Sequence, residues 1–367
     1  MEFSVFNLME QRDPQKSTAS ILNEAVQQTR LADELGYGAA WFAEHHFSNY
    51  CICPSPLLMI ARCAGETKQI KLGSGILVLP LYDPVRLVSE VAMIDALCDG
   101  RFLLGVGGGY QPYEFQRFGL DLSDSWQRSE EILDIIELGL SQEEFSFAGR
   151  YYSLPKSHVA PRPTNGVPPV WLAGAAPAMF RRAARKGYVP FVTAKTGPTS
   201  GAVAVRDRCA EMFAEEGVPV DRMPFGLQRH CYVTDSKDDA LSFVENVRYQ
   251  LRLAGALRRR EETWEGHALV ERPGPDEQSL DEMLANMLVG DSHTIAERLS
   301  HEIRAVNPSH VCLHTQTGAV AHGAVMHSIG RFADEVIPLI EKEIGPIGSY
   351  GTNRQVPQKN SKRKAAG

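Results

Sequence analysis

The sequence has no long hydrophobic run and no recognisable export signal. No stretch of about 18 uninterrupted apolar residues occurs, so we expect no membrane-spanning helix. The amino terminus, Met1-Glu2-Phe3-Ser4, has no basic segment followed by an apolar one, so we expect no signal peptide. We therefore expect a soluble protein of the cytoplasm.

The sequence has no large excess of acidic or of basic residues, and it has few cysteines. The 38 Lys and Arg residues are interspersed with 45 Asp and Glu residues, for a net charge of −7. This balance favours solubility and gives no reason to expect a nucleic-acid partner. The seven cysteines are odd in number and dispersed, which is typical of reduced thiols rather than of a disulfide framework. No Gly-x-Ser-x-Gly elbow stands out, and this disfavours a serine hydrolase.

What the chain does have is a regular alternation of strand-like and helix-like segments. The predicted strands span 3–8, 39–43, 70–79, 102–106, 170–173, 189–192, 225–233 and 311–313. Each precedes a predicted helix: 18–35, 56–66, 84–97, 125–140, 177–186, 202–216, one from about 237, and 322–343. Eight such units exceed what most doubly wound sheets carry, so the pattern favours a (β/α)8 TIM barrel of class α/β.

Three segments lie outside this repeat. Residues 141–168 contain an aromatic, glycine-bearing stretch and several prolines, which predicts a hairpin-like insertion. Residues 255–290 are charged and contain Pro273-Gly274-Pro275, which predicts a second insertion, either a lid or a solvated loop. Residues 347–367 are polar and basic, which is typical of a disordered tail. We therefore expect one barrel domain over residues 1–346.

Glu44-His45-His46 comes at the carboxyl end of the second predicted strand. Catalytic side chains of barrels gather at this end, and a neutral imidazole near Glu44 could act as a general base. Neighbouring strand residues point to opposite sides, so either one histidine serves the site and the other the wall, or the strand has already ended. A hydrogen-bonded histidine pair without a chemical role is the plain alternative.

Metal binding is a second interpretation of the same region, because Cys51 and Cys53 follow His45 and His46 closely. One residue separates the two cysteines, which is less than the two to four usual in structural zinc sites. We therefore predict no metal site here.

Three glycine-containing segments follow or interrupt predicted strands: 73–75, 105–110 and 173–177. Glycine lets a backbone approach a planar ring or a phosphate closely, and Pro177 suits the first turn of a helix whose free amides could bind an anion. Tight turns explain each segment equally well. As phosphate motifs they are weak, because neither dinucleotide nor P-loop spacing is present.

Together these motifs resemble the luciferase-like flavin-dependent monooxygenase family, in particular its bacterial luciferase (alkanal monooxygenase) branch. The resemblance rests on an ordered set of segments that is spread over most of residues 1–343. The set comprises 40–47 (Ala-Trp-Phe-Ala-Glu-His-His-Phe), 72–80, 83–86, 100–102, 105–110, 114–115, 118–119, 289–292 and 296–299. It implies a barrel that holds reduced FMN at the carboxyl ends of its strands.

The resemblance also implies a reaction and its partners. Members of the family usually take reduced FMN from a separate NAD(P)H:flavin reductase and form a C4a-(hydro)peroxyflavin with O2. That species oxidises a small organic substrate, such as an aldehyde, ketone, sulfonate or amine. A homodimer is likewise expected from the family.

Individual residues carry the family's roles by their matching positions. His45 matches the catalytic histidine, expected to act as an acid or base, with Glu44 beside it. Gly75 and Ile76 match a position beside the flavin ring that often has a cis peptide bond. The implied cofactor-binding residues are Ser74, Gly75, Ile76, Gly107, Gly108, Gly109, Tyr110, Gly174, Ala175 and Ala176.

This chain departs from luciferase at the flavin phosphate. Gly108 replaces an arginine, and Ala175 and Ala176 replace an acidic and a hydroxyl residue. The phosphate would then be held by backbone amides alone, by another basic residue such as Lys195, or only weakly. Three alternatives stay open: an enzyme that uses the deazaflavin F420, a metal-dependent barrel hydrolase, and a partner subunit without activity.

The substrate is not identified by the sequence. Phe6, Phe47, Tyr50 and Tyr110 near the expected mouth favour an apolar pocket, although core packing explains such residues equally well. The basic run 258–260 could meet an acidic substrate or simply be solvated.

Overall fold

Eight parallel strands close into a barrel in the computed structural model, which describes residues 1–275 and 277–351 without the side chain of Lys195. The ring consists of β1 (Glu2–Asn7), β2 (Ala39–Phe42), β3 (Lys71–Ser74), β5 (Phe102–Gly107), β8 (Val170–Ala173), β9 (Val189–Lys195), β10 (Gly226–Val233) and β14 (His310–His314). Strand β14 pairs with both β10 and β1, and β10 also pairs with β9, so the ring is closed. The predicted (β/α)8 barrel is confirmed.

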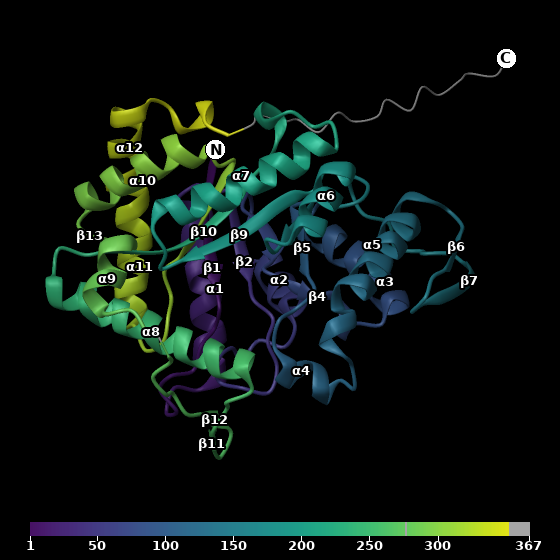
Figure 1. The fold of residues 1–367 in the computed structure, drawn as a ribbon, viewed down its shortest axis with the longest axis horizontal. Helices are drawn as coiled ribbons and strands as arrows, with labels where there is room; N and C mark the ends of the chain where they lie inside the picture. Colours follow the sequence, from purple (N-terminus) through teal and green to yellow (C-terminus); the bar gives the residue numbers. More distant parts are fainter. Residues whose placement is uncertain (276, 352–367) are drawn as a thin grey trace.

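A ring of helices covers the barrel (Figure 1). The helices that follow the strands are α1 (Thr18–Glu34), α2 (Pro56–Ala64), α3 (Pro84–Leu97), α5 (Ser125–Ser141), α6 (Pro177–Lys186), α7 (Thr199–Glu215), α8 (Lys237–Arg259) and α11 (His322–Arg331). Their starts have local causes: the Asp83 carboxylate accepts hydrogen bonds from the backbone N–H of Val85 and Arg86 at the start of α3. Among the described residues, none of the helices is both long and apolar enough to cross a membrane.

The predicted strand 70–79 is divided into β3 and the short strand β4 (Leu77–Val78), which pairs with β5. Further elements were not predicted: the short helix α4 (Pro112–Arg117), and helix α10 (Ser292–Val306) with the edge strand β13 (Leu288–Gly290). The final predicted helix, 322–343, is α11, a π-turn at Phe332–Val336 and α12 (Ile337–Ile344).

An aromatic cluster fills the lower part of the barrel, toward the amino ends of the strands. Trp41 is fully buried, and its ring centroid lies 4.9 Å from that of Trp171 and 5.2 Å from that of Phe191. Its indole N–H donates to the Ser4 hydroxyl at 3.1 Å. This packing fills the barrel toward the amino ends of its strands, and Phe191 is also part of the lining of the cavity at the carboxyl ends.

The glycines of β3 and β5 are explained by this packing. A Cβ at Gly73 would lie 2.4 Å from the Trp41 ring, and one at Gly105 would lie 1.8 Å from the Ser74 carbonyl oxygen. Neither distance is compatible with a side chain. Close approach was one of the predicted reasons for glycine here, and the groups that approach these two glycines belong to the protein itself.

The first predicted insertion is confirmed as a hairpin, and the second needs corrected limits. Strands β6 (Phe145–Ala148) and β7 (Ser153–Ser157) pair antiparallel and project from one side of the barrel (Figure 1). The second insertion does not start at 255, because α8 continues through Arg259, and it ends before β13. Between them lie the small hairpin β11 (Trp264–Glu265) and β12 (Ala268–Leu269) and helix α9 (Leu280–Asn286).

The β11–β12 hairpin lies at the carboxyl end of the barrel, beside α4 and the end of α8 (Figure 1). The Trp264 ring packs on that of Tyr113 in α4, with centroids 5.0 Å apart. The insertion is therefore in the place that a lid would occupy.

The predicted tail, 347–367, begins too early. Residues 347–351 pack against the start of the chain: the amino group of Met1 donates to the carbonyl oxygens of Ile347 and Tyr350, at 3.1 and 2.8 Å. Ile347 and Tyr350 are apolar residues that also pack against the core. The rest of the predicted tail, 352–367, lies outside the described residues.

Candidate active site

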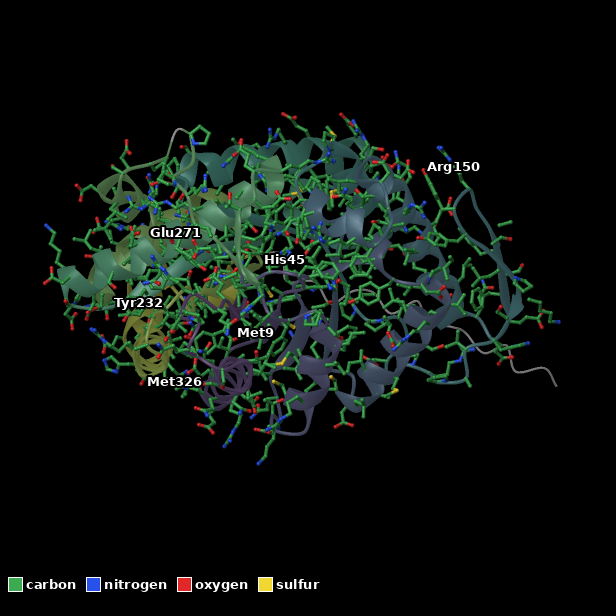
Figure 2. All side chains as sticks on the ribbon, turned by 90° about the horizontal axis from the view of Figure 1, so that it is seen from below. Met9, His45, Arg150, Tyr232, Glu271 and Met326 are labelled. Carbon is green, nitrogen blue, oxygen red and sulfur yellow. The ribbon has the colours of Figure 1, made fainter. Side chains whose placement is uncertain are left out.

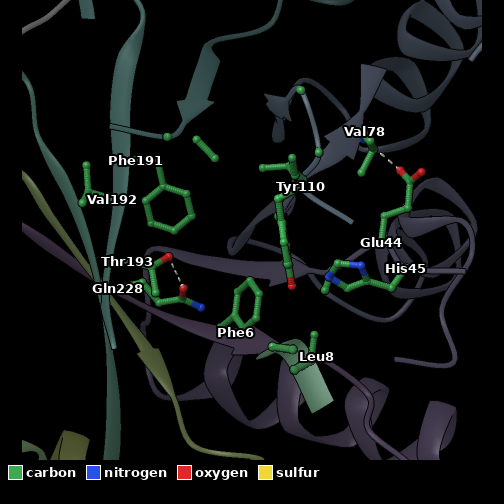
Figure 3. A pocket seen from close by; sticks show the side chains of 18 of the residues that line it. Phe6, Leu8, Glu44, His45, Val78, Tyr110, Phe191, Val192, Thr193 and Gln228 are labelled. Carbon is green, nitrogen blue, oxygen red and sulfur yellow. Dashed lines mark hydrogen bonds between the residues drawn. The ribbon is translucent and has the colours of Figure 1, made fainter. Parts of the chain in front are cut away.

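A cavity of about 470 Å³ opens at the carboxyl ends of the barrel strands (Figure 3). Figure 2, which looks onto this end of the molecule, shows His45 near its middle. The walls come from the loops after β1, β2, β3, β5 and β8, from β9, β10 and β14, and from α8. The predicted site residues among them are Glu44, His45, Gly75, Ile76, Gly108, Gly109, Tyr110, Gly174 and Ala175.

Three other predicted site residues are not part of the cavity lining. The Ser74 hydroxyl donates to the Gly105 carbonyl at 2.7 Å and is fully buried between strands. Gly107 makes room for a neighbour, since a Cβ there would lie 2.4 Å from Ile76 Cδ1. Ala176 is the residue that caps α6. Each supports a neighbour that does reach the cavity.

His45 points into the cavity because β2 ends at Phe42, two residues before Glu44. Of the two explanations predicted for the adjacent histidines, the second is confirmed: the strand has ended before it reaches them. His45 Nδ1 lies 3.1 Å from Glu114 Oε1. The ring meets those of Tyr50 and Tyr110 edge-on, with centroids 4.8 and 5.7 Å away.

His46 belongs to the wall behind this pair. Its backbone N–H donates to Glu114 Oε1 at 2.7 Å, and its Nε2 lies 3.0 Å from Glu44 Oε1. Its ring packs edge-on against Phe118, 5.0 Å away. His46 therefore helps to hold both carboxylates in place.

Glu44 does not bond to His45, contrary to the simplest expectation from their adjacency. Its carboxylate accepts hydrogen bonds from the Tyr82 hydroxyl at 2.7 Å and from the Val78 backbone N–H at 3.1 Å (Figure 3). Burial raises the pKa of Glu44, although its bonds with His46, Tyr82 and Val78 act in the opposite direction. The bonds tie the loop after β2 to β4.

Glu114 is the functional candidate that the sequence reasoning missed. It is 1% exposed, it lines the cavity, and it bonds to both His45 Nδ1 and the His46 backbone. It comes from α4, 69 residues farther along the chain than His45. Its one signal in the sequence is its place in a family-matching segment, 114–115.

The alternative metal site has no geometric support. Among the described residues, no group of three His, Cys, Asp or Glu side chains could hold a metal ion. All seven cysteines are buried free thiols. Burial raises the pKa of the Cys51 thiol well above its usual range and that of Cys53 to about 12, which disfavours the thiolate that a metal would need.

The end of the cavity near Ala175 has little positive charge. Of the described side chains that line the cavity, Arg258 is the one Lys or Arg, and its guanidinium lies 4.9 Å from the centre of the Tyr110 ring. The predicted basic run does not act as a unit, because Arg259 pairs with Glu261 at 2.6 Å and Arg260 ends α8. The side chain of Lys195 lies outside the described part of the chain.

The aromatic residues predicted near the mouth separate into two groups. Phe6, Tyr50 and Tyr110 line the cavity, and the Tyr110 hydroxyl donates to that of Tyr50 at 3.2 Å. Burial raises the pKa of both phenols, so both stay protonated near neutral pH. Phe47 is 53% exposed and lies outside the cavity lining.

These walls suit a flavin ring. They are largely apolar, and the Gly75–Ile76 peptide bond beside the cavity is cis, as the family resemblance leads one to expect. A Cβ at Gly75 would lie 3.0 Å from Phe6 Cε2, so glycine keeps this wall open. The Gly174 backbone N–H already donates to the Phe191 carbonyl at 3.2 Å, so the amides left for an anion are those of Ala175 and of the start of α6.

A barrel with its cavity on the strand-to-helix loops and a histidine–carboxylate pair inside it has the architecture of TIM-barrel enzymes. Residues 1–306 match the family model described as luciferase-like monooxygenase. The chain therefore belongs to the luciferase-like monooxygenase family.

Curated relatives include an uncharacterised protein and a component of a flavin-dependent monooxygenase. An uncharacterised protein of Sinorhizobium fredii is 37% identical over 94% of this chain and 99% of its own length. The oxygenase component of the flavin-dependent trigonelline monooxygenase of Acinetobacter baylyi is 32% identical over 65% of this chain and 67% of its own.

Solved structures show the same fold at low identity. The monooxygenase RslO1 of Streptomyces bottropensis superposes with a TM-score of 0.78 at 21% identity, over 92% of this chain and 99% of its own. The FMN complex of 3,6-diketocamphane monooxygenase of Pseudomonas putida gives 0.76 at 19%, over 92% and 98%. An F420-dependent secondary alcohol dehydrogenase gives 0.71 at 17%, also over 92% and 98%.

Proposed function

We propose that this protein is the oxygenase component of a two-component monooxygenase that uses reduced FMN and O2. The observation that carries this proposal is the His45–Glu114 pair, which faces a flavin-sized apolar cavity beside Gly75–Ile76. Reduced FMN, when bound, supplies two electrons to O2, so that one oxygen atom enters a small organic substrate and the other leaves as water.

In this proposal the protein contributes proton transfer and the exclusion of water. A carboxylate that accepts the Nδ1 hydrogen leaves Nε2 of His45 as the nitrogen that can exchange a proton with the cavity. Glu114 is held in turn by the His46 backbone and acts as a positioning residue. The phenols of Tyr50 and Tyr110, both protonated, add no negative charge of their own beside His45.

The proposed flavin contacts follow the cavity. Gly75, Ile76, Gly108, Gly109 and Tyr110 would border the ring, and the backbone amides of Ala175 and of the start of α6 would meet the phosphate. Ser74, Gly107 and Ala176 would act from behind these walls. Arg258 at the mouth is a second candidate for the phosphate, in place of the arginine that luciferase has where Gly108 stands.

The proposal includes a separate NAD(P)H:flavin reductase, because the trigonelline relative is named as an oxygenase component. It also includes a homodimer in the cytoplasm. Exposed apolar side chains on the adjacent helices α2 and α3, namely Leu58, Val85, Met93 and Leu97, support an interface there. Light scattering on the purified protein would measure its mass, and a monomer would contradict this part.

The test of the function compares two cofactors and follows oxygen. Anaerobic fluorescence titrations should show saturable binding of reduced FMN and none of reduced F420. With an added flavin reductase and a panel of aldehydes, ketones, sulfonates and amines, O2 consumption should couple to an oxygenated product. Binding of F420 alone, or O2 consumption that yields hydrogen peroxide with every compound, would refute the proposal.

A further inference from the structure

One side of helix α8 forms part of the cavity wall. Gln250, Leu251, Ala254 and Arg258 line the cavity, and their spacing of three to four residues places them along one face of the helix. Arg258 lies in the last turn and ends this row. The end of α8 lies beside α4 and the β11–β12 hairpin (Figure 1). An arginine side chain therefore borders the cavity at its mouth.

The positive charge of Arg258 is available to a ligand. The side chain is exposed, and its guanidinium lies 4.9 Å from the centre of the Tyr110 ring. Contact with an aromatic face orients a guanidinium but leaves its N–H groups able to donate. Within the described residues no carboxylate forms an ion pair with Arg258, whereas Arg259 in the same turn is paired with Glu261.

The ring of Tyr110 lies between this cation and the proposed chemistry. It also meets the His45 ring edge-on, with centroids 5.7 Å apart. A molecule bound to Arg258 through one end can therefore extend along this ring toward His45. Both carboxylates that line the cavity, Glu44 and Glu114, are bonded to other groups, so neither of them occupies Arg258.

The rest of the lining favours a ligand with an apolar body. It is largely apolar, and Phe6, Leu8, Leu251 and Ala254 belong to it. An apolar body that enters the cavity is removed from water, which stabilises binding. An anionic group on the same molecule has one place to gain a positive partner, because Arg258 is the one Lys or Arg among the described side chains of the lining.

We propose that Arg258 binds the anionic group of the substrate, and that the substrate is a small carboxylate with an apolar body such as an aromatic ring. The carboxylate would accept two N–H groups from one edge of the guanidinium, and the body would extend into the cavity toward His45. The flavin phosphate, the other anion considered for Arg258, is then left to the amides of Ala175 and of the start of α6. The assignment to substrate rests on the proposed oxygenase function.

Two probes of equal shape and different charge test the proposal. Benzoate and benzamide share an aromatic body, and only benzoate is an anion. Ligand-observed NMR titrations of the full chain, under anaerobic conditions with and without reduced FMN, should give a dissociation constant about tenfold lower for benzoate. This preference should shrink as the salt concentration rises from about 0.05 M to about 0.5 M, because an exposed charge is screened. A preference for benzamide, or no preference, would overturn the proposal.

Variants of two adjacent arginines show whether contact with Arg258 is the cause. Arg258→Met keeps an apolar side chain and should weaken benzoate about tenfold while benzamide binds as before. Arg258→Lys keeps the charge and should retain a preference for benzoate. Arg259→Met is the matched control, because it removes the same charge from the same helical turn but outside the cavity lining, and it should change neither dissociation constant. Equal weakening of benzoate by Arg258→Met and Arg259→Met would overturn the proposal, since the net charge of the helix end would then attract the anion.

Parallel titrations with reduced FMN and reduced riboflavin distinguish the two anions. The flavins differ in the phosphate alone, so Arg258→Met should bind each of them as the wild type does. A selective loss of FMN binding in Arg258→Met would assign Arg258 to the flavin phosphate and overturn the proposal. A preference for benzoate that Arg258→Met abolishes, in a protein that binds no reduced FMN, would uphold the anion site and refute the oxygenase.

Discussion

Replacement of His45 by alanine is expected to lower coupled product formation about 10²–10⁴-fold, the range for the loss of a general acid–base group. Binding of reduced FMN should change little, because His45 is one of many residues around the cavity. O2 consumption should continue but yield hydrogen peroxide. The measurement is product formed per O2 consumed with a substrate accepted in the panel, together with an anaerobic titration of reduced FMN.

The neighbouring residues make this prediction specific. His46→Asn is the neighbouring control: it keeps the backbone N–H that donates to Glu114, and it removes the side-chain contact with Glu44 but leaves His45 in place. It should retain product formation within about tenfold. Glu114→Gln should lower kcat while KM stays the same, since Glu114 orients His45 and is not proposed to touch the substrate. A His45→Ala variant that couples O2 to product as well as the wild type would exclude His45 from the chemistry.

The barrel could be predicted from the sequence because each unit carries local signals. A short apolar run followed by a helical apolar period recurs along the chain, and some of the helices also begin at a capping residue, such as Asp83 before α3. The interval 255–290 was assigned wrongly because its charged composition masks the end of α8 and the three-residue strand β13. Charged composition distinguishes a loop from a buried strand, but it does not distinguish a loop from the exposed end of a helix.

Site residues could be predicted where their place after a strand is enough to locate them. They could not be predicted where contacts between distant parts of the chain bring them to the cavity. His45 follows a strand and was found, whereas its partner Glu114 comes from a six-residue helix that has no periodic signal. The sequence did not predict that Gln228 and His230 of β10 line the cavity, because Gln228, Arg229 and His230 are all polar. This run hides which residues face inward, although Gln228 and His230 line the cavity and Arg229 points outward to Glu302.

That outward residue leads to the largest expected effect on stability. Arg229 and Glu302 are 2% and 1% exposed, and Arg229 Nε lies 3.4 Å from Glu302 Oε1. Arg229 also donates to the carbonyl oxygens of Gly197 at 2.8 Å and Asn286 at 2.5 Å. Arg229→Met should therefore lower the free energy of unfolding by about 3–5 kcal/mol at pH 7, because it leaves a buried carboxylate without its counter-charge. Urea denaturation measures this change.

The same variant should be sensitive to pH in a defined direction. Burial raises the pKa of Glu302 above its ordinary value, while Arg229 acts to lower it. Removal of Arg229 should raise this folded-state pKa further above that of the unfolded chain. Stability that depends on protonated Glu302 is then lost as pH rises from about 4.5 through the folded pKa. The deficit of Arg229→Met should accordingly be smaller at pH 5 than at pH 8.

Two further variants show whether the buried charge is the cause. In the Arg229→Met background, Glu302→Gln should recover more than half of the lost stability and remove the added pH dependence, because a neutral amide can still accept from Thr199. Arg304→Met is the exposed control: its 2.9 Å pair with Glu343 is 51% and 39% exposed and should contribute about 1 kcal/mol or less. Equal losses of unfolding free energy in Arg229→Met and Arg304→Met would contradict this prediction. They would show that the contacts of Arg229 with the two carbonyl oxygens and with Glu302 contribute little to stability, and that packing holds β10 in place.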